Sequence, residues 1–495
     1  MTNLANNLVS TAAAGPERAA IILNDTRMSY AELDSATARM AGYFVAQGIH
    51  PGDRVALMLP NVPAFPVIYY GVLRVGGVVV PMNPLFKRRE IEYYLSDSGA
   101  KMIFAMPGEA QAAAEAAVVT FVPVEGGDTI AMSGIVDSAV PVSDVADRAD
   151  DDTAVILYTS GTTGRPKGAE LTHANLNSNQ DVSARTLFNL TERDVVMGCL
   201  PLFHVFGMTC GLNTVVATGA SLTLIPRFDG DAALDVIARD RVTVFEGVPT
   251  YYMAMLNKAD GRDTDLSSLR LAVAGGSSLP VEVLHKFEKT FGCMILEGYG
   301  LSETSPVASF NHPDAERKPG SIGFAIEGVE MALVDESGTE VPTGELGEIV
   351  IRGQNIMRGY WKQPEATAEA IKDGWFHSGD LARCDEDGYF YIVDRIKDMI
   401  LRGGLNVYPR EVEEVLYEHP AIAEAAVVGV PHDTLGEEVA AFVVLTPGKS
   451  ADPAEVSQFV KDRLAGYKYP RQVTVVQALP KTASGKILKR ELPRS

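Results

Sequence analysis

Helix-like and strand-like segments alternate through most of this 495-residue chain, and the alternation limits the folds that it can adopt. Amphipathic periodicity predicts helices over residues 30–47 and 65–73, and short apolar runs predict buried strands over 54–58 and 77–80. Such alternation favours parallel, doubly wound sheets with helices on both faces. The chain is also too long for a single core, so we expect at least two domains.

The pattern changes in the last third of the chain. Residues 321–358 are rich in β-branched residues and turns, which predicts an antiparallel or barrel-like part. After residue 394 a short mixed pattern of helices and strands begins, long enough for an independent domain. We therefore expect an α/β plus α+β fold. Its large N-terminal domain, residues 1–396, holds doubly wound sheets and a small barrel-like part, and a small mobile α+β domain spans residues 397–495.

Residues 158–168, Tyr-Thr-Ser-Gly-Thr-Thr-Gly-Arg-Pro-Lys-Gly, follow an apolar run and precede a helix expected over 172–179. Glycines allow successive backbone N–H groups to converge on an anion, while hydroxyl and cationic side chains add donors. This composition predicts a loop that binds phosphate. The candidate ligands are Thr159, Ser160, Gly161, Thr162, Thr163, Gly164 and Lys167.

The loop is not a Walker A motif, because Pro166 precedes the lysine and Gly168 follows it. It resembles, nearly residue for residue, the phosphate loop of the adenylate-forming enzymes, which include acyl-CoA synthetases, aryl-CoA ligases, luciferases and nonribosomal adenylation domains. The resemblance implies a ligase that converts acid and ATP into acyl-AMP and pyrophosphate. It then converts acyl-AMP and CoA into acyl-CoA and AMP, with Mg²⁺ as cofactor.

Other motifs of that family occur in the same order along the chain. Residues 297–304, Glu-Gly-Tyr-Gly-Leu-Ser-Glu-Thr, match its second signature, although the family usually has Thr at Ser302 and often Gln at Glu297. The resemblance implies that Tyr299 stacks on adenine, that Ser302 meets a phosphate and that Glu303 binds Mg²⁺. The nucleotide site would also include Gly276, Ser277, Glu297, Gly298, Asp380 and Arg395.

The basic C-terminal segment matches the family at Lys486, which would be the catalytic lysine. The substrate carboxylate and the α-phosphate repel each other by roughly 4 kcal/mol at about 4 Å and an effective dielectric near 20. A lysine between them reverses that term. We expect Lys481, Lys489 and Arg490 to be surface charges. Lys397 matches the family's hinge, and after a domain rotation Gly403 and Gly404 would leave room for CoA.

The resemblance places His204 beside the substrate carboxylate, in an orienting catalytic role, although a satisfied core histidine is the ordinary interpretation of such a residue. Relatives that activate malonate carry Arg where this chain has Gly298, so a monocarboxylic acid is expected. The candidate acyl pocket consists of Phe206, Val248, Tyr252, Gly276 and Pro306.

A medium- or long-chain fatty acid is the expected substrate. The alternatives are a 4-coumarate or cinnamate-type aryl acid, and an adenylation enzyme that loads an acyl-carrier protein. The net charge of −21 argues against nucleic acid. The first residues lack a signal-peptide pattern, and residues 205–225 contain too many glycines and hydroxyls for a membrane span, so a cytoplasmic protein is expected. The oligomeric state is open, and a homodimer is allowed.

Overall fold

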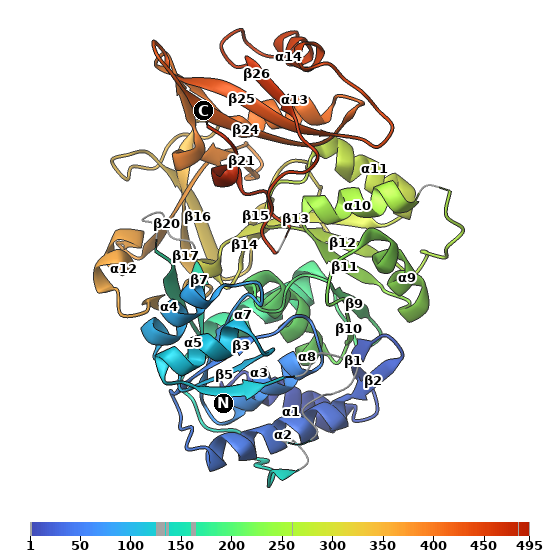
Figure 1. Ribbon diagram of the computed structural model, residues 1–495, viewed down its shortest axis with the longest axis vertical. Helices are drawn as coiled ribbons and strands as arrows, with labels where there is room; N and C mark the ends of the chain where they lie inside the picture. Colours follow the sequence, from blue (N-terminus) through green and yellow to red (C-terminus); the bar gives the residue numbers. More distant parts are fainter. Residues whose placement is uncertain are drawn as a thin grey trace.

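The computed structural model describes residues 2–124, 134, 138–159, 165–259, 261–483 and 485–494. Five of the predicted phosphate ligands, residues 160–164, therefore lie outside the described residues. Within the described part the strands form four sheets. Figure 1 shows the chain beginning at the bottom of the molecule and its C-terminal part forming a separate block at the top.

The largest sheet has nine strands and carries one half of the site. Its central strands are parallel, and antiparallel strands close both ends. In spatial order the strands are β15 (Phe324–Ala325), β14 (Val307–Phe310), β13 (Met294–Gly300), β12 (Leu271–Ala274), β11 (Val244–Gly247), β9 (Val195–Gly198), β10 (Ser221–Leu224), β1 (Ala19–Leu23) and β2 (Thr26–Ser29). The parallel strands consist largely of fully buried apolar residues, because helices cover both faces of this part of the sheet.

A second, seven-stranded sheet is also mainly parallel. Its order is β18 (Gly359–Tyr360), β8 (Lys167–Thr172), β7 (Thr153–Thr159), β4 (Val78–Pro81), β3 (Arg54–Met58), β5 (Met102–Ala105) and β6 (Thr120–Pro123). The helices that alternate with the strands of these two sheets are α1 (Ala5–Ala14), α2 (Tyr30–Ala46), α3 (Ala64–Arg74), α4 (Arg88–Ser98), α5 (Glu109–Ala117), α7 (His173–Val182), α8 (Thr214–Thr218), α9 (Gly230–Asp240), α10 (Pro249–Ala259) and α11 (Val281–Phe291). The predicted doubly wound α/β architecture is confirmed.

The context of the predicted phosphate loop differs from the expectation. Strand β8 follows the loop and pairs antiparallel with β7, with Thr159 opposite Lys167. The helix then begins at His173, where Thr172 caps it by accepting a hydrogen bond from the Asn175 N–H. The loop therefore connects two strands of a hairpin, and the helix comes one strand later than expected, because residues 167–172 continue the sheet.

The antiparallel part predicted after residue 321 is present. Strands β16 (Val329–Val334), β17 (Gly347–Gly353), β20 (Trp375–Cys384), β19 (Ile371–Lys372) and β21 (Phe390–Arg395) form the third sheet, and the short helix α12 (Pro364–Ala370) lies beside it. Pairing of β20 with β21 sets Asp380 opposite Arg395. Register in this sheet thus brings together two residues that the sequence predicts to act as a pair.

The C-terminal block contains the fourth sheet and two helices. The strands are β23 (Leu405–Val407), β22 (Ile400–Arg402), β25 (Gly436–Leu445), β24 (Ile422–His432) and β26 (Gln472–Val475), and the helices are α13 (Pro409–Tyr417) and α14 (Pro453–Lys461). This unit has its own buried apolar cluster, which includes Val412, Val427 and Val456. A separate core is the physical basis for an independent small domain.

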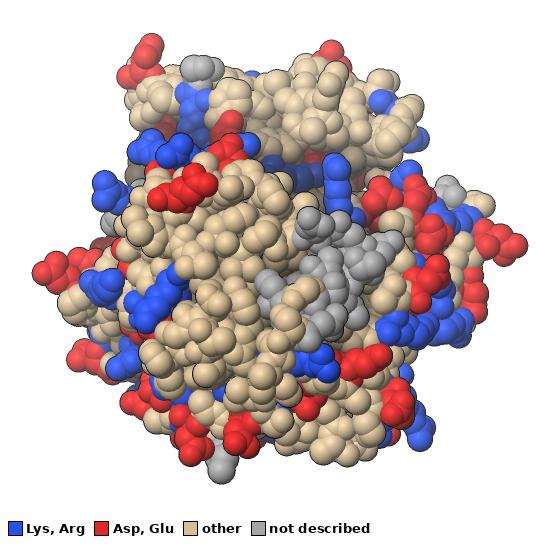
Figure 2. All heavy atoms as spheres, turned by 60° about the horizontal axis from the view of Figure 1, so that its bottom comes forward, with Lys and Arg blue, Asp and Glu red and all other residues tan. Residues whose placement is uncertain are grey.

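Residues 205–225 form a buried helical stretch followed by a strand, as expected. The π-helix η2 (Gly207–Asn213) continues into α8, and β10 follows. Among the described residues no helix combines the length and apolarity that crossing a membrane requires. Figure 2 shows acidic and basic side chains interspersed around one face of the molecule, with Lys and Arg side chains in the hollow beneath the C-terminal block.

Candidate active site

Lys486 belongs to the C-terminal domain, but its hairpin contacts the N-terminal domain. The hairpin is held by a hydrogen bond from the Thr482 N–H to the Lys486 carbonyl, 2.8 Å. Thr250, at the start of α10, donates its hydroxyl to the Gly485 carbonyl at 3.1 Å. Gly485 has φ +82°, and a Cβ there would lie 2.8 Å from Thr250 Oγ1. Only glycine allows this close approach, which directs the next residue toward the large domain.

The charges around Lys486 come from both domains. Burial, with the Arg395 guanidinium next, lowers the pKa of its ammonium to about 8, against the opposing effects of Asp380 and Asp398. A lysine with this pKa is still largely protonated at neutral pH. The structure therefore brings a desolvated cation to the place where Asp380 and Arg395 meet.

Asp380 is almost fully buried, accepts one hydrogen bond and forms one ion pair with residues predicted for the nucleotide site. The Tyr299 hydroxyl donates to its Oδ2 at 2.6 Å, and Arg395 Nε lies 3.1 Å from its Oδ1. Burial, with Asp380 next, raises the pKa of Tyr299 well above its ordinary value, so the phenol keeps its proton. The predicted trio is thus one connected group. Tyr299 also has a role that the sequence did not suggest, because it orients the carboxylate.

His204 lies within electrostatic reach of Lys486. Burial lowers the pKa of His204 to about 4, and the Lys486 ammonium contributes to that shift. Its Nδ1 accepts a hydrogen bond from the Phe206 N–H at 3.3 Å. The imidazole is therefore neutral at physiological pH, with Nε2 left to donate. A neutral donor next to a cation is suited to orienting a carboxylate.

The other end of the site surrounds Glu303. Tyr360 donates its hydroxyl to Glu303 Oε1 at 2.9 Å, and Thr159 donates to the same oxygen at 3.4 Å. Lys167 Nζ lies 5.1 Å from the centre of the Tyr360 ring, which is a cation–π distance. Thr159 and Lys167 flank the segment 160–164, so a carboxylate and a lysine stand at the base of the predicted phosphate loop. Ser302 precedes Glu303 in the same 3₁₀ turn.

Among the described residues both of these hydrogen bonds go to Oε1 of Glu303, and none is made to Oε2. A carboxylate oriented by hydroxyl donors has a fixed direction, which suits a Mg²⁺ ligand. The residues present therefore fit the predicted cofactor. Tyr360 is a site residue that the sequence analysis missed, because a Gly-Tyr-Trp segment carries no obvious chemistry until β18 pairs with β8.

Glu297 is buried at the domain boundary. Its Oε2 accepts a hydrogen bond from the Gly320 N–H at 3.0 Å. Burial raises the pKa of Glu297 to about 7, against the opposing effects of that N–H and of the Arg410 guanidinium. Arg410 belongs to α13 and donates from Nη1 to the Ile392 carbonyl at 2.6 Å, which links the two domains.

Replacing Glu297 with glutamine is expected to stabilise the protein above pH 7 and to leave it little changed at pH 5. The native state retains a proton on Glu297 between pH 4.5 and about 7, so the wild type loses stability as pH rises through that window. The difference corresponds to at most about 3 kcal/mol. Thermal melts of both proteins from pH 5 to 8 check this. Parallel Tm profiles across that range would contradict it.

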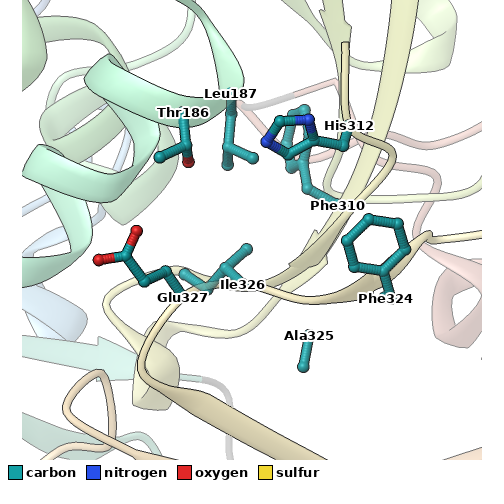
Figure 3. Close-up of a pocket in the computed structure, with 8 residues that line it drawn as sticks. All are labelled: Thr186, Leu187, Phe310, His312, Phe324, Ala325, Ile326 and Glu327. Carbon is teal, nitrogen blue, oxygen red and sulfur yellow. The ribbon is translucent and has the colours of Figure 1, made fainter. Parts of the chain in front are cut away.

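Gly298 has no room for a side chain. A Cβ there would lie 2.1 Å from two ring carbons of Phe310, which is opposite Gly298 in β14. On its outer side Phe310 lines a pocket of about 200 Å³. Figure 3 shows this pocket, with His312, Phe324 and Glu327 at its rim. Phe310 thus occupies the place that a Cβ at position 298 would take, so in this arrangement a side chain such as arginine has no room there.

Three of the five predicted acyl-pocket residues lie together. A Cβ on Gly276 would be 3.4 Å from Val248 Cγ1, and the neighbouring Gly275 faces the Phe206 ring. Gly276 and Ser277 lie in the exposed loop after β12. Tyr252 is elsewhere: its ring packs against Phe245 and Phe287, at centroid distances of 5.0 and 4.8 Å. Pro306 is buried just before β14.

The residues assigned to the second half-reaction lie in two places, and of these Lys397 is close enough to Lys486 to help lower its pKa. Lys397 is in the 3₁₀ turn Ile396–Asp398, directly after β21. Gly403 and Gly404 form the exposed turn between β22 and β23, with φ of 58° and 82°. In this arrangement Lys486 lies near Asp380 and Arg395, which are predicted to bind the nucleotide, and the glycine turn is solvent-exposed.

One expectation about the C-terminal charges is wrong. Lys489 is not a surface charge: its side chain is three-quarters buried, and Nζ lies 2.7 Å from Glu413 Oε1. Lys481 does lie at the surface, where it pairs with Glu424 at 2.7 Å. Sequence spacing did not reveal the difference, because α13, which carries Glu413, packs against the C-terminal segment only in the folded domain.

Comparison with known proteins agrees with this geometry. Residues 8–361 match the family model described as AMP-binding enzyme, and residues 411–486 match the AMP-binding enzyme C-terminal domain. A long-chain-fatty-acid–CoA ligase of Bacillus subtilis (strain 168) is 38% identical, over 98% of this chain and 93% of the relative. A feruloyl-CoA synthase of an Amycolatopsis species is 41% identical, over 98% of this chain and 97% of the relative.

Among solved structures, an anthranilate CoA ligase in complex with anthranoyl-AMP superposes with a TM-score of 0.92 at 29% identity, covering 99% of this chain and 96% of that one. Two family models that together span both domains, and relatives near 40% identity over almost the whole chain, leave the family in no doubt. The chain belongs to the AMP-binding enzymes, the adenylate-forming superfamily.

Proposed function

We propose that the protein is an ATP-dependent ligase that joins a monocarboxylic acid to CoA through an acyl adenylate. The observation that carries this proposal is the position of Lys486, which is buried within electrostatic reach of both His204 and the Asp380–Arg395 pair. The named CoA ligases and synthases among the relatives support CoA as the acceptor. These relatives are named for different acids, a long-chain fatty acid in one case and a feruloyl group in the other.

In the first half-reaction the acid carboxylate attacks the α-phosphorus of ATP, and the bond to the β-phosphate breaks to release pyrophosphate. Asp380 would accept hydrogen bonds from the ribose hydroxyls, since Tyr299 and Arg395 already hold its carboxylate in place. The Lys486 ammonium would contact the carboxylate and α-phosphate oxygens, where negative charge gathers in the transition state. Neutral His204 would orient the attacking carboxylate.

Thr159 and Lys167 would hold the β- and γ-phosphates that leave as pyrophosphate. Glu303, oriented by Tyr360, would bind Mg²⁺, which would neutralise phosphate charge. Because Lys167 belongs to the large domain and Lys486 to the small one, the two ends of the triphosphate would be held by different domains. Closure of the small domain would then complete the site only when ATP and acid are bound.

In the second half-reaction the CoA thiol attacks the acyl carbonyl and AMP leaves. Lys486 occupies one approach to that carbonyl, so the small domain would have to rotate about Lys397. We propose residues 1–396 and 397–495 as the two moving parts. The exposed turn at Gly403 and Gly404 would then replace the Lys486 hairpin and face the adenylate.

The sequence favours a medium- or long-chain fatty acid, and the Bacillus relative agrees with it. An aryl acid is the second candidate. It is favoured by the Amycolatopsis relative and by a buried carboxyl group, Glu246, in the strand that leads to Val248. A saturated chain offers that carboxyl nothing to pair with.

A panel of acids incubated with ATP, Mg²⁺ and CoA tests the proposed function. We expect acid-dependent pyrophosphate release and a thioester product with at least one monocarboxylic acid, and no turnover of short dicarboxylates. Mass spectrometry identifies the thioester, and a coupled assay measures pyrophosphate. Acid-dependent pyrophosphate release without a CoA thioester would instead favour loading of an acyl-carrier protein.

A further inference from the structure

Glu246 is a buried carboxyl group that the proposed mechanism does not use. It lies in β11 with 1% of its surface exposed. Its Oε1 has no hydrogen-bond partner among the residues that the structure describes. A buried carboxyl without a partner destabilises the fold, so its presence requires an explanation outside the protein's own contacts.

The carboxyl of Glu246 lies against the π-helix η2. A Cβ on Gly211 would lie 3.3 Å from Glu246 Oε2, so the absence of a side chain at Gly211 lets the carboxyl approach the helix backbone. Cys210 of the same π-helix lies near Glu246. The hydroxyl of Thr209, also in η2, is buried without a partner among the described residues. The unpaired Oε1 of Glu246 thus lies beside a helix inside an apolar core.

This spot lies on the acyl side of the active site. Val248, two residues beyond Glu246, is the residue that faces Gly276. Helix η2 begins directly after Phe206, which faces Gly275 and is close to His204. Seven residues separate His204 from Gly211, and at a helical rise of about 1.5 Å per residue this is a distance of up to roughly 10 Å. A substrate that extends along η2 from His204 would reach Glu246 with its far end.

The protonation state of Glu246 defines what it can bind. Burial raises the pKa of Glu246 well above its ordinary value, so the carboxyl is uncharged at neutral pH. An uncharged carboxyl donates one hydrogen bond and accepts others, which matches a hydroxyl group. A methylene or methyl group would leave Oε1 unpaired, and a second carboxylate would be desolvated without a cation.

We propose that Glu246 determines substrate specificity by hydrogen-bonding a hydroxyl group at the end of the acid farthest from its carboxylate. The proposal rests on the proposed function and names its substrate class: hydroxylated monocarboxylic acids of limited length. Two sources share this chemistry, a hydroxyaryl-propenoic acid and an omega-hydroxy medium-chain fatty acid. The plain fatty acid expected from the sequence lacks the group that would pair with Glu246.

Matched pairs of acids test the proposal. The pairs are para-hydroxycinnamate with cinnamate, and omega-hydroxyoctanoate with octanoate. For wild type we expect the hydroxylated member of at least one pair to have a kcat/KM roughly tenfold higher or more. Glu246→Gln keeps a neutral donor and acceptor and should keep most of that ratio. Glu246→Leu has neither and should reduce the ratio to about one or below.

Thermal stability provides a second readout, because Leu is close to Glu in size. If Oε1 has no partner in the free enzyme, Glu246→Leu should melt at or above the wild-type temperature. A clearly lower Tm, or failure of this variant to fold, would show that the carboxyl already has a structural partner, and would overturn the proposal. An unchanged hydroxyl preference in Glu246→Leu, or no preference in wild type for either pair, would overturn it too.

Two further measurements separate this proposal from the proposed function. Dissociation constants of the same acids, measured by calorimetry without CoA, decide the role of Glu246 even if no thioester forms. The dissociation constant of omega-aminooctanoate shows whether Glu246 recognises a cationic group in place of a hydroxyl group. If it binds best, and Glu246→Gln loses it, Glu246 pairs with a cation and the hydroxyl proposal is wrong.

Discussion

Replacing Lys486 with alanine is expected to lower the rate of adenylate formation by roughly 10³-fold or more, while thioester formation from a preformed acyl adenylate continues. The ammonium is the only group from the C-terminal domain that we assign to the first transition state. In the second half-reaction the small domain would have rotated and removed Lys486 from the adenylate, so the attack of CoA would not depend on this lysine.

Acid-dependent exchange of labelled pyrophosphate into ATP measures the first half-reaction, and mixing synthetic acyl-AMP with CoA measures the second. Lys481→Ala is the matched control, since Lys481 lies in the same hairpin but pairs with Glu424 at the surface. We expect it to change either rate by less than about twofold. Exchange that survives in Lys486→Ala would remove this lysine from the mechanism.

Replacing Lys397 with proline is expected to have the opposite effect, with acyl-AMP accumulating and thioester formation slowed by roughly 10²-fold or more. Proline locks φ and restricts the residue before it, so a turn that must change its dihedral angles loses that freedom. The adenylation arrangement already exists in this structure, with Lys486 beside Asp380 and Arg395. It should therefore remain accessible to the variant.

Quenched-flow analysis of acyl-AMP and acyl-CoA in a single turnover checks this expectation. Lys397→Ala removes the side chain but keeps the backbone free, and we expect both steps to remain near wild-type rates. Equal loss of both half-reactions in Lys397→Pro would indicate a damaged fold, and the hinge would then have to be sought at another residue.

Much of the architecture could be predicted because buried strands and amphipathic helices leave direct periodic signals. Strand β3 has the predicted bounds, and α2 differs from the prediction by one residue at its end. The exception next to the site is β8. Its residues 167–172 combine lysine, glycine and glutamate with apolar residues, so only pairing with β7 makes them a strand.

The residues of the candidate site also fall into two groups, those that the sequence predicts and those that only the structure identifies. Asp380, Arg395, Tyr299 and Lys486 could be named from motifs, because family motifs preserve the order of chemical groups along the chain. Tyr360 and Glu246 could not, because neither lies in a recognisable motif, and Lys489 lies in one but was expected at the surface. Their importance comes from neighbours that are distant in sequence: Glu303 for Tyr360, Glu413 for Lys489, and η2 for Glu246.

The amino-acid sequence alone therefore determined the class of fold, the family and the groups available for adenylation, since periodicity and local motifs are properties of contiguous residues. Only the tertiary structure decided that Lys486 meets Asp380 and Arg395 of the large domain and that Phe310 fills the space beside Gly298. It also showed that Glu246 is buried with no partner for Oε1 among the described residues. Electrostatics and packing depend on distances between segments far apart in the chain. Substrate choice is such a property, because it depends on which side chains converge at the far end of the acid.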